Sequence, residues 1–266
     1  MAHAIATWLL PIFFALVGVE LRSEIKSGVF KTKRDLVIPF SAATFGVLVP
    51  FLIYQAFVIG FNIDFAGWGV VVATDLPLAL LALKLFKQST AHILRPYLLS
   101  LAIFDDLISI VLIALVYHQN GIHPTVYGFL IGLLLPVTKN SKLIRHLDKF
   151  VNFVVIPLFV IATIAENLTF EIGLLTLAVI VARMGGKPIG IFIGDLFARK
   201  LLKSSLLNTK EVLAIGTLAT LGLSVSLLFT EIAKAPAIAI SSVFLVIPIA
   251  LIRIKVLSKS FLKGDF

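Results

Sequence analysis

Long apolar segments follow one another along nearly the whole chain, separated by short polar connections. Each is close to the length that a helix needs to cross a bilayer. Because 59% of the 266 side chains are hydrophobic and 14% are charged, the chain has more apolar surface than a soluble domain of this size can bury. The pattern predicts an all-α, polytopic membrane protein with about nine transmembrane helices. The segments cover roughly residues 5–21, 36–59, 66–86, 96–117, 122–137, 150–165, 172–197, 212–232 and 237–257.

The basic residues indicate which side of the membrane each connection occupies. Twenty of the 23 lysine and arginine residues lie in connections on one side, Lys234 alone lies on the other, and Arg183 and Lys187 lie within an apolar segment. Since cytoplasmic loops are enriched in lysine and arginine, we expect the N-terminus outside the cell and the C-terminus in the cytoplasm. The protein is then a multi-pass protein of the inner cell membrane. The net charge of +9 reflects sidedness rather than nucleic-acid binding.

The order of the segments predicts an internal repeat. With this orientation, one group of three segments begins in the cytoplasm and a later group of three begins outside. Two three-helix units of opposite orientation are typical of inverted-repeat transporters. The expected divisions are a first helix with its basic loop at 1–35, a first repeat at 36–118, two connecting helices at 119–170, a second repeat at 171–257 and a cytoplasmic tail at 258–266.

The middle segment of each group contains residues that disrupt helices. Pro77 follows Thr74 and Asp75 in the first group, and Gly216 and Gly222 lie among threonines and serines in the second. A proline inside a helix removes a backbone donor and crowds the preceding turn. We therefore expect two interrupted crossing helices, supported by Thr74, Asp75 and Gly222, with a simple kink as the alternative. Asp75 could bind a cation together with Thr74, or it could neutralise the positive end of a half-helix.

Two adjacent carboxylates, Asp105 and Asp106, lie in the middle of the segment at 96–117. Each ionised aspartate at the centre of a bilayer costs roughly 2.5–3.5 kcal/mol. This cost suggests a function, although one of the two could be a packing residue with an unseen donor. Neighbouring residues in a helix point about 100° apart, so one carboxylate can face a cavity while the other faces a partner helix.

Two basic residues lie in the segment at 172–197. We expect Lys187 to pair with a carboxylate of the segment at 96–117, because an unpaired ammonium in hydrocarbon would lose its proton or draw in water. Arg183 lies one turn earlier and cannot lose its proton, so it needs a permanent acceptor. Asp195 could pair with either, but its position near the end of the segment predicts an interfacial residue.

This combination of residues predicts ion exchange. Buried acids near a basic residue can exchange a proton for a metal ion as the pH changes, and we expect this metal ion at Asp105 and Asp106. Competition of the two ions for one carboxylate pair couples their fluxes if the site opens to each side in turn. The sequence has no P-loop and no cysteine. We therefore expect neither an ATP-driven pump nor an enzyme, and no cofactor besides the transported ions.

Five short motifs together resemble the NhaA family of sodium/proton antiporters, which has inverted repeats. They are FFALVGVE at 13–20, ATD at 73–75, AIFDDL at 102–107, GIHPT at 121–125 and GKPIG at 186–190. They occur in the family's order, from the first predicted span to the last third of the chain.

The resemblance implies roles for individual residues. Asp105 and Asp106 match the family's ion- and proton-binding aspartates, and Lys187 matches the lysine that bonds to the first of them. Thr74 and Asp75 match the pair at the interrupted helix.

The resemblance also implies a regulation and an assembly. Glu20 and Glu24 fall at positions that the family uses in its cytoplasmic pH response. Family members exchange sodium or lithium for protons electrogenically and are commonly dimers. The expected partners are therefore the lipid bilayer, small cations and a second copy of the chain.

The chain departs from the family pattern in several places. Family proteins typically have twelve spans, whereas here the first of them is absent and only a short turn fits between Tyr117 and Gly121, where relatives have two further helices. Arg183 stands where an apolar residue is expected, and Ser23 replaces a basic residue near the pH-response acids. A permanent charge one turn from Lys187 could change the proton stoichiometry or lock the core.

The main hypothesis is a secondary transporter that exchanges sodium or lithium for protons by alternating access. One alternative keeps the fold and changes the cargo, with Arg183 and Lys187 gripping an organic anion in a sodium-coupled carrier. A second alternative is a shortened relative that no longer transports, which the missing helices favour. A membrane protease is disfavoured, because Phe192 and Ile193 stand where its Gly-x-Gly-Asp pattern would need a glycine before Gly194.

Overall fold

Helices make up nearly all of the part of the chain that the structure describes. The computed structural model describes residues 2–27, 32–62, 68–116, 124–136, 141–166, 172–232 and 237–262. Within these ranges every predicted apolar segment contains helix, which confirms the all-α prediction. Three helical segments are long and apolar enough to cross a membrane in the described ranges: Lys33–Gly60, Leu174–Leu202 and Ala239–Phe261.

The chain forms two compact units that are interleaved in sequence. The first consists of Met1–Thr32 and Asp106–Leu168, and the second of Lys33–Asp105 and Thr169–Phe266. The division falls within helix α5 (Gln88–Val116), between its two adjacent aspartates.

The first unit contains two helices that pack closely because glycines line their contact. A Cβ atom at Gly128 of α6 would overlap the carbonyl group of Pro11 in α1, and one at Gly132 would overlap that of Ala15. Small residues spaced by four allow helix backbones to approach in this way. Besides the second half of α5, the unit comprises α1 (Ala2–Ser27), α6 (Pro124–Leu134), α7 (Lys142–Phe150), the π-helical turn η2 (Val151–Val155) and α8 (Ile156–Glu166).

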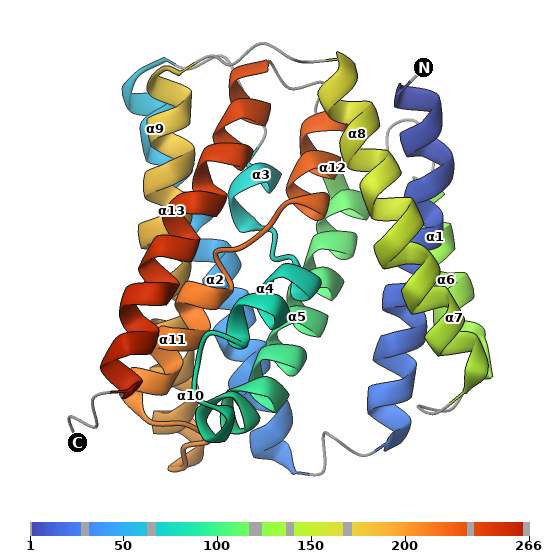
Figure 1. Cartoon of the computed structure of the whole chain (residues 1–266). Helices are drawn as coiled ribbons and strands as arrows, with labels where there is room; N and C mark the ends of the chain where they lie inside the picture. The colour runs from blue at the N-terminus through green and yellow to red at the C-terminus, as the bar shows by residue number, and fades with distance from the viewer. Residues whose placement is uncertain are drawn as a thin grey trace. The chain divides into compact units, whose positions relative to one another are not determined.

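The second unit contains the remaining elements, which Figure 1 shows as long helices around short ones. Besides the first half of α5, they are α2 (Lys33–Gly60), α3 (Gly69–Val72), α4 (Leu76–Leu83), α9 (Leu174–Val181), the π-helical turn η3 (Ala182–Gly186), α10 (Lys187–Leu202), α11 (Thr209–Leu218), α12 (Ser224–Ile232) and α13 (Ala237–Leu262).

Helices α2 and α10 form the closest packed pair of the second unit. A Cβ atom at Gly190 would overlap the carbonyl group of Phe45, and one at Gly194 would overlap that of Ser41. The Ser41 hydroxyl donates a hydrogen bond of 2.8 Å to the Gly194 carbonyl oxygen. This backbone-to-backbone contact holds α10, and with it the charged residues of this segment, at a defined depth against α2.

Two helices of the second unit are interrupted at the places that the sequence predicts. Residues 73–75 separate α3 from α4, and residues 219–223 separate α11 from α12. In Figure 1, α3 and α12 lie on one side of these breaks, and α4 and α11 lie on the other. The two breaks touch, since the Asp75 amide donates a hydrogen bond of 2.8 Å to the Leu221 carbonyl oxygen. Both helices are therefore interrupted rather than merely kinked.

Candidate functional site

The side chain of Asp105 lies at the centre of a buried polar cluster and is 2% exposed. One of its oxygens, Oδ2, accepts hydrogen bonds from Lys187 Nζ at 2.7 Å and from the Thr74 hydroxyl at 2.5 Å. The other oxygen, Oδ1, is buried and has no hydrogen-bond donor among the described residues. A buried carboxylate oxygen without a donor is costly, so Oδ1 is the place where a proton or a cation would be stabilised.

Lys187 is completely buried and contacts two elements besides its own. It forms the ion pair with Asp105 of α5, as the sequence predicted, and it also donates a hydrogen bond to the carbonyl oxygen of Val72, the last residue of α3. The last carbonyls of a helix carry partial negative charge. The ammonium group therefore compensates both a carboxylate and a helix end.

Asp75 marks the start of α4 and is also buried. Its side chain caps the helix, with Oδ1 accepting a hydrogen bond of 3.3 Å from the Leu78 amide. A negative group at a helix N-terminus is stabilised by the partial positive charge there. This contact supports the second of the two interpretations of Asp75, neutralisation of a half-helix end.

Thr74 connects the two breaks to the ion pair. Its hydroxyl lies 2.5 Å from Asp105 Oδ2 and 3.1 Å from the carbonyl oxygen of Ala219. A hydroxyl has one proton, so it can donate to only one of these acceptors at a time. Of the two contacts, the one to Asp105 is the shorter, so Thr74 joins the first break directly to the ion pair.

Arg183 is fully buried and its guanidinium donates four hydrogen bonds. The acceptors include carbonyl oxygens of both interrupted helices, which supply the permanent acceptors that the sequence required for this residue. The bonds run from Nε to Thr220 O at 2.9 Å, from Nη1 to Val70 O at 3.0 Å and to Ser226 Oγ at 2.7 Å, and from Nη2 to Ala73 O at 2.7 Å.

Gly222 leaves the space in which this guanidinium lies. A Cβ atom at this position would overlap Arg183 Nη2 and the Ala73 carbonyl oxygen. The predicted supporting role of Gly222 thus has a steric basis, because a larger residue would displace the arginine from the break.

The remaining predicted residues belong to the first unit. Asp106 follows Asp105 in α5 and is half-buried, and Glu20 is half-buried in α1. Glu24 belongs to α1, but its side chain lies outside the described residues. The structure thus brings Thr74, Asp75, Asp105, Arg183, Lys187 and Gly222 together within the second unit.

A second buried polar cluster was not anticipated, and it contains Asp195. This aspartate, predicted near the end of its segment, is fully buried within the protein. It accepts a hydrogen bond of 3.0 Å from the Tyr97 hydroxyl and forms an ion pair with Arg199 one turn later, so it pairs with neither Arg183 nor Lys187. The (i, i+4) spacing of Asp195 and Arg199 could have predicted their ion pair. No sequence feature separates Tyr97 from the other aromatic residues of the apolar segments.

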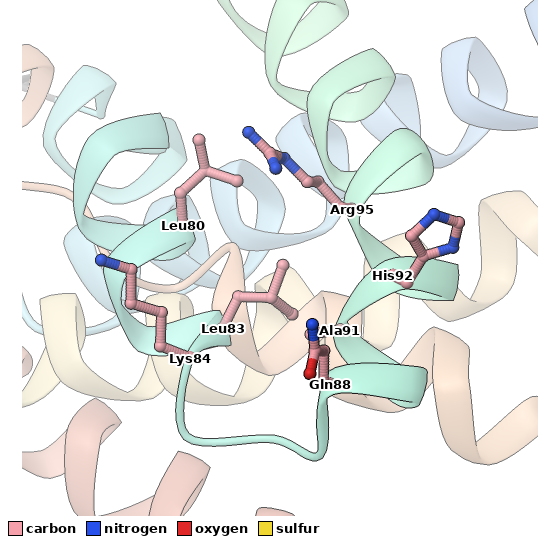
Figure 2. Close-up of a pocket in the computed structure, with 7 residues that line it drawn as sticks. All are labelled: Leu80, Leu83, Lys84, Gln88, Ala91, His92 and Arg95. Atoms are coloured by element: carbon pink, nitrogen blue, oxygen red, sulfur yellow. The ribbon is translucent and has the colours of Figure 1, made fainter.

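A pocket of about 320 Å³ lies between α4 and the start of α5, away from the ion pair. In Figure 2, Arg95 extends toward Leu80, whereas Lys84 and His92 lie on opposite sides of the view. Lys84 and Arg95 therefore line the same pocket. The lining residues are Leu80, Leu83, Lys84, Gln88, Ala91, His92 and Arg95.

Comparison with known proteins identifies the family. The model of the family described as Na+/H+ antiporter 1 matches residues 1–120 and 117–262. The chain belongs to this family. The match confirms the resemblance to NhaA proteins that the five motifs indicate.

Individual relatives from several bacteria agree with this assignment. The chain is 31% identical over 280 residues to Na(+)/H(+) antiporter NhaA 2 of Flavobacterium johnsoniae, covering 82% of this chain and 68% of that protein. It is 28% identical over 283 residues to NhaA 1 of Klebsiella pneumoniae, covering 85% and 72%. It is 27% identical over 296 residues to NhaA of Vibrio cholerae, covering 89% and 78%.

Proposed function

We propose that this protein exchanges sodium for protons across the cell membrane. Membership of the Na+/H+ antiporter 1 family supports this function. The observation that carries it at the level of atoms is the buried Oδ1 of Asp105, which lacks a donor among the described residues while Oδ2 accepts from both Lys187 and Thr74. An oxygen in this state binds whichever positive ion reaches it, so protons and sodium compete for it.

The exchange follows from that competition. When sodium binds at Asp105, with Asp106 as the principal cation ligand, the carboxylate gives up its proton to the side where the site is open. When the site faces the other side, a proton displaces the sodium. Lithium binds by the same oxygen ligands, since hard cations prefer oxygen. Lys187 is the cation whose ion pair with Asp105 couples proton binding to sodium binding.

The architecture that suits this cycle is the predicted one, with nine transmembrane helices and two inverted three-helix repeats that cross at the breaks near Thr74 and Gly222. The N-terminus lies outside and the C-terminus in the cytoplasm, the site opens alternately to each side, and the protein assembles as a homodimer. Glu20 and Glu24 adjust the activity to the cytoplasmic pH.

The organic-anion carrier is less well supported. It needs Arg183 and Lys187 to present their charges to a substrate. The guanidinium of Arg183 instead donates to four groups of the protein, and Lys187 is paired with Asp105. An entering carboxylate would have to replace buried hydrogen bonds that are already made.

Proton movement in liposomes tests the function. Purified protein is reconstituted into vesicles that hold an acid-inside pH gradient and a trapped pH dye, and sodium, lithium, potassium or choline is added outside. We expect sodium and lithium to collapse part of the gradient, and potassium and choline to leave it unchanged. Repeating the assay with a series of organic carboxylates examines the alternative cargo.

Two results would contradict the proposal. One is a folded protein that moves no protons with sodium or lithium between mildly acid and alkaline pH, which would favour the transport-inactive relative. The other is uptake of a carboxylate compound in place of ion-linked proton movement, which would favour the anion carrier.

A further inference from the structure

Arg183 differs from the other buried charges of the site in what it contacts. Among the described residues it has no carboxylate partner at ion-pair distance, and its four acceptors are three backbone carbonyls and one hydroxyl. A guanidinium that is completely buried without a carboxylate needs several strong acceptors, because leaving its donors unmade is costly. The acceptors it has found belong to both interrupted helices.

These acceptors lie where two helices end. Val70 and Ala73 belong to the C-terminal end of α3, and Thr220 follows the C-terminal end of α11. The last carbonyls of a helix have no amide partner within it, and together they carry a partial negative charge. Arginine offers five donors in a rigid fork, so a single side chain can satisfy carbonyls from both ends.

The second break is shaped to receive this fork. Gly222 has no Cβ atom to occupy the space taken by Nη2, and the Ser226 hydroxyl accepts a hydrogen bond from Nη1. The contacts of Lys187 given above are to α3 and to Asp105. Both cations thus contact the end of α3, and Arg183 also contacts the second break.

We propose that Arg183 is a positioning residue for ion exchange: it ties the ends of α3 and α11 together and supplies a permanent positive charge there, beside the Lys187 that pairs with Asp105. The transport part of this inference rests on the proposed function. The part that concerns the two helix ends rests on the hydrogen bonds alone.

The charge of Arg183 also acts on the ion site. Asp75 and Asp105 both interact electrostatically with its guanidinium, so a further cation that reaches Asp105 meets this fixed positive charge. Among the described residues, Lys187 is the second cation here, and it pairs with Asp105. Arginine keeps its charge at any physiological pH.

The experiment separates the charge of Arg183 from its hydrogen bonds. Arg183→Lys keeps the charge but cannot reach both helix ends, whereas Arg183→Gln removes the charge. Ser226→Ala removes one acceptor, and Lys187→Gln removes the neighbouring cation. Arg145→Lys and Arg145→Gln, at an exposed position of α7, are the matched controls. Thermal melting of the purified full-length protein and proton flux in liposomes across a range of sodium concentrations are measured for each.

We expect both Arg183 variants to lower the melting temperature more than Lys187→Gln does, with a smaller decrease for Ser226→Ala. Both Arg183 variants lose hydrogen bonds to a charged group. If transport requires the two helix ends to stay together, we expect each variant to reduce the flux by roughly ten-fold or more. Arg183→Gln should also lower the sodium concentration that gives half-maximal flux, because a positive charge that opposes sodium near Asp105 is removed. Arg183→Lys and the Arg145 controls should keep the wild-type value.

The proposal is wrong if Lys187→Gln lowers the melting temperature as much as Arg183→Gln, or if Arg183→Gln leaves the sodium concentration for half-maximal flux unchanged. Should neither Arg183 variant fold, Ser226→Ala decides the matter, and an unchanged melting temperature would refute the tie between the breaks. If the wild-type protein moves no protons with sodium, the proposed function fails, while the melting comparison still decides the inference.

Discussion

Two buried polar clusters join α5 to α10, and they differ in how completely their oxygen atoms are used. In one, Asp105 has an oxygen without a donor among the described residues, while its other oxygen accepts twice. In the other, Asp195 accepts from Tyr97 through one oxygen and is ion-paired with Arg199 through the other. Each cluster lies eight residues from the other on both helices, which corresponds to about 12 Å along a helix axis.

The difference shows that burial of an acid does not by itself indicate ion binding. Asp195 is as well buried as Asp105, but its ion-pair partner Arg199 lies one turn later on the same helix. Asp105 instead is bonded to Thr74, at the interruption between α3 and α4, and to Lys187 of another helix. Both carboxylates have one buried oxygen without a hydrogen bond among the described residues, but Asp195 Oδ2 is ion-paired with Arg199 of its own helix, whereas Asp105 Oδ1 lies beside a helix break.

The largest expected contrast is between Asp105→Asn and Asp195→Asn. An asparagine amide at position 105 neither releases a proton nor carries the charge that sodium needs, so we expect sodium-linked proton flux to be lost. Sites more than about 10 Å apart act independently in most proteins, so Asp195→Asn should keep flux within about two-fold of wild type. Sodium binding to the purified variants, with proton release recorded at the same time, provides the measurement. Equal loss of flux in both would remove the distinction between the two clusters.

A smaller effect is expected where both clusters depend on one helix contact. Gly190 lies between Lys187 and Asp195 on α10, and a Cβ there would overlap the Phe45 carbonyl group. Gly190→Ala should therefore destabilise the protein by about 1–3 kcal/mol. Gly185→Ala is the matched control, because nothing lies within 4 Å of a Cβ at that position, and its change should stay below about 1 kcal/mol. Melting curves compare the two; similar values would mean that α10 does not depend on this approach.

The smallest expected effect sharpens the description of the Asp195 cluster. Tyr97→Phe removes the hydroxyl that donates to Asp195 Oδ1 and keeps the ring, so we expect a loss of about 1 kcal/mol of stability with normal sodium-linked flux. Denaturation in detergent and the liposome assay measure the two quantities. A clear decrease in flux without loss of stability would assign this cluster a part in transport.

Much of the second unit was predictable because the bilayer restricts the choices. The lengths of the apolar segments predicted the helices, and Pro77, Gly216 and Gly222 predicted the breaks. The cost of an unpaired ammonium predicted that Lys187 pairs with a carboxylate of the segment at 96–117, which is Asp105. Each inference uses a property that is local to the residues concerned or a charge that must find its opposite.

The unpredicted features depend on tertiary contacts to groups that every residue has. The acceptors of Arg183 are mostly backbone carbonyls, which no sequence pattern marks, and they are available only because two breaks meet. The position of Asp195 in its segment did not predict its burial or its hydrogen bond with Tyr97 of α5. The division of the chain within α5 also follows from packing that the order of segments does not reveal.

The π-helical turn η3 sets the angular relation between Arg183 and the helix that follows it. Such a turn accommodates one residue more than a regular turn does, so removing Gly185, whose Cβ position faces open space, would restore ordinary winding. Arg183 lies inside this turn, so the shorter backbone would shift its guanidinium away from its carbonyl acceptors. Chain length in this short stretch is thus as strictly constrained as chemical identity, and an arginine here is useful only to a backbone that carries the extra residue.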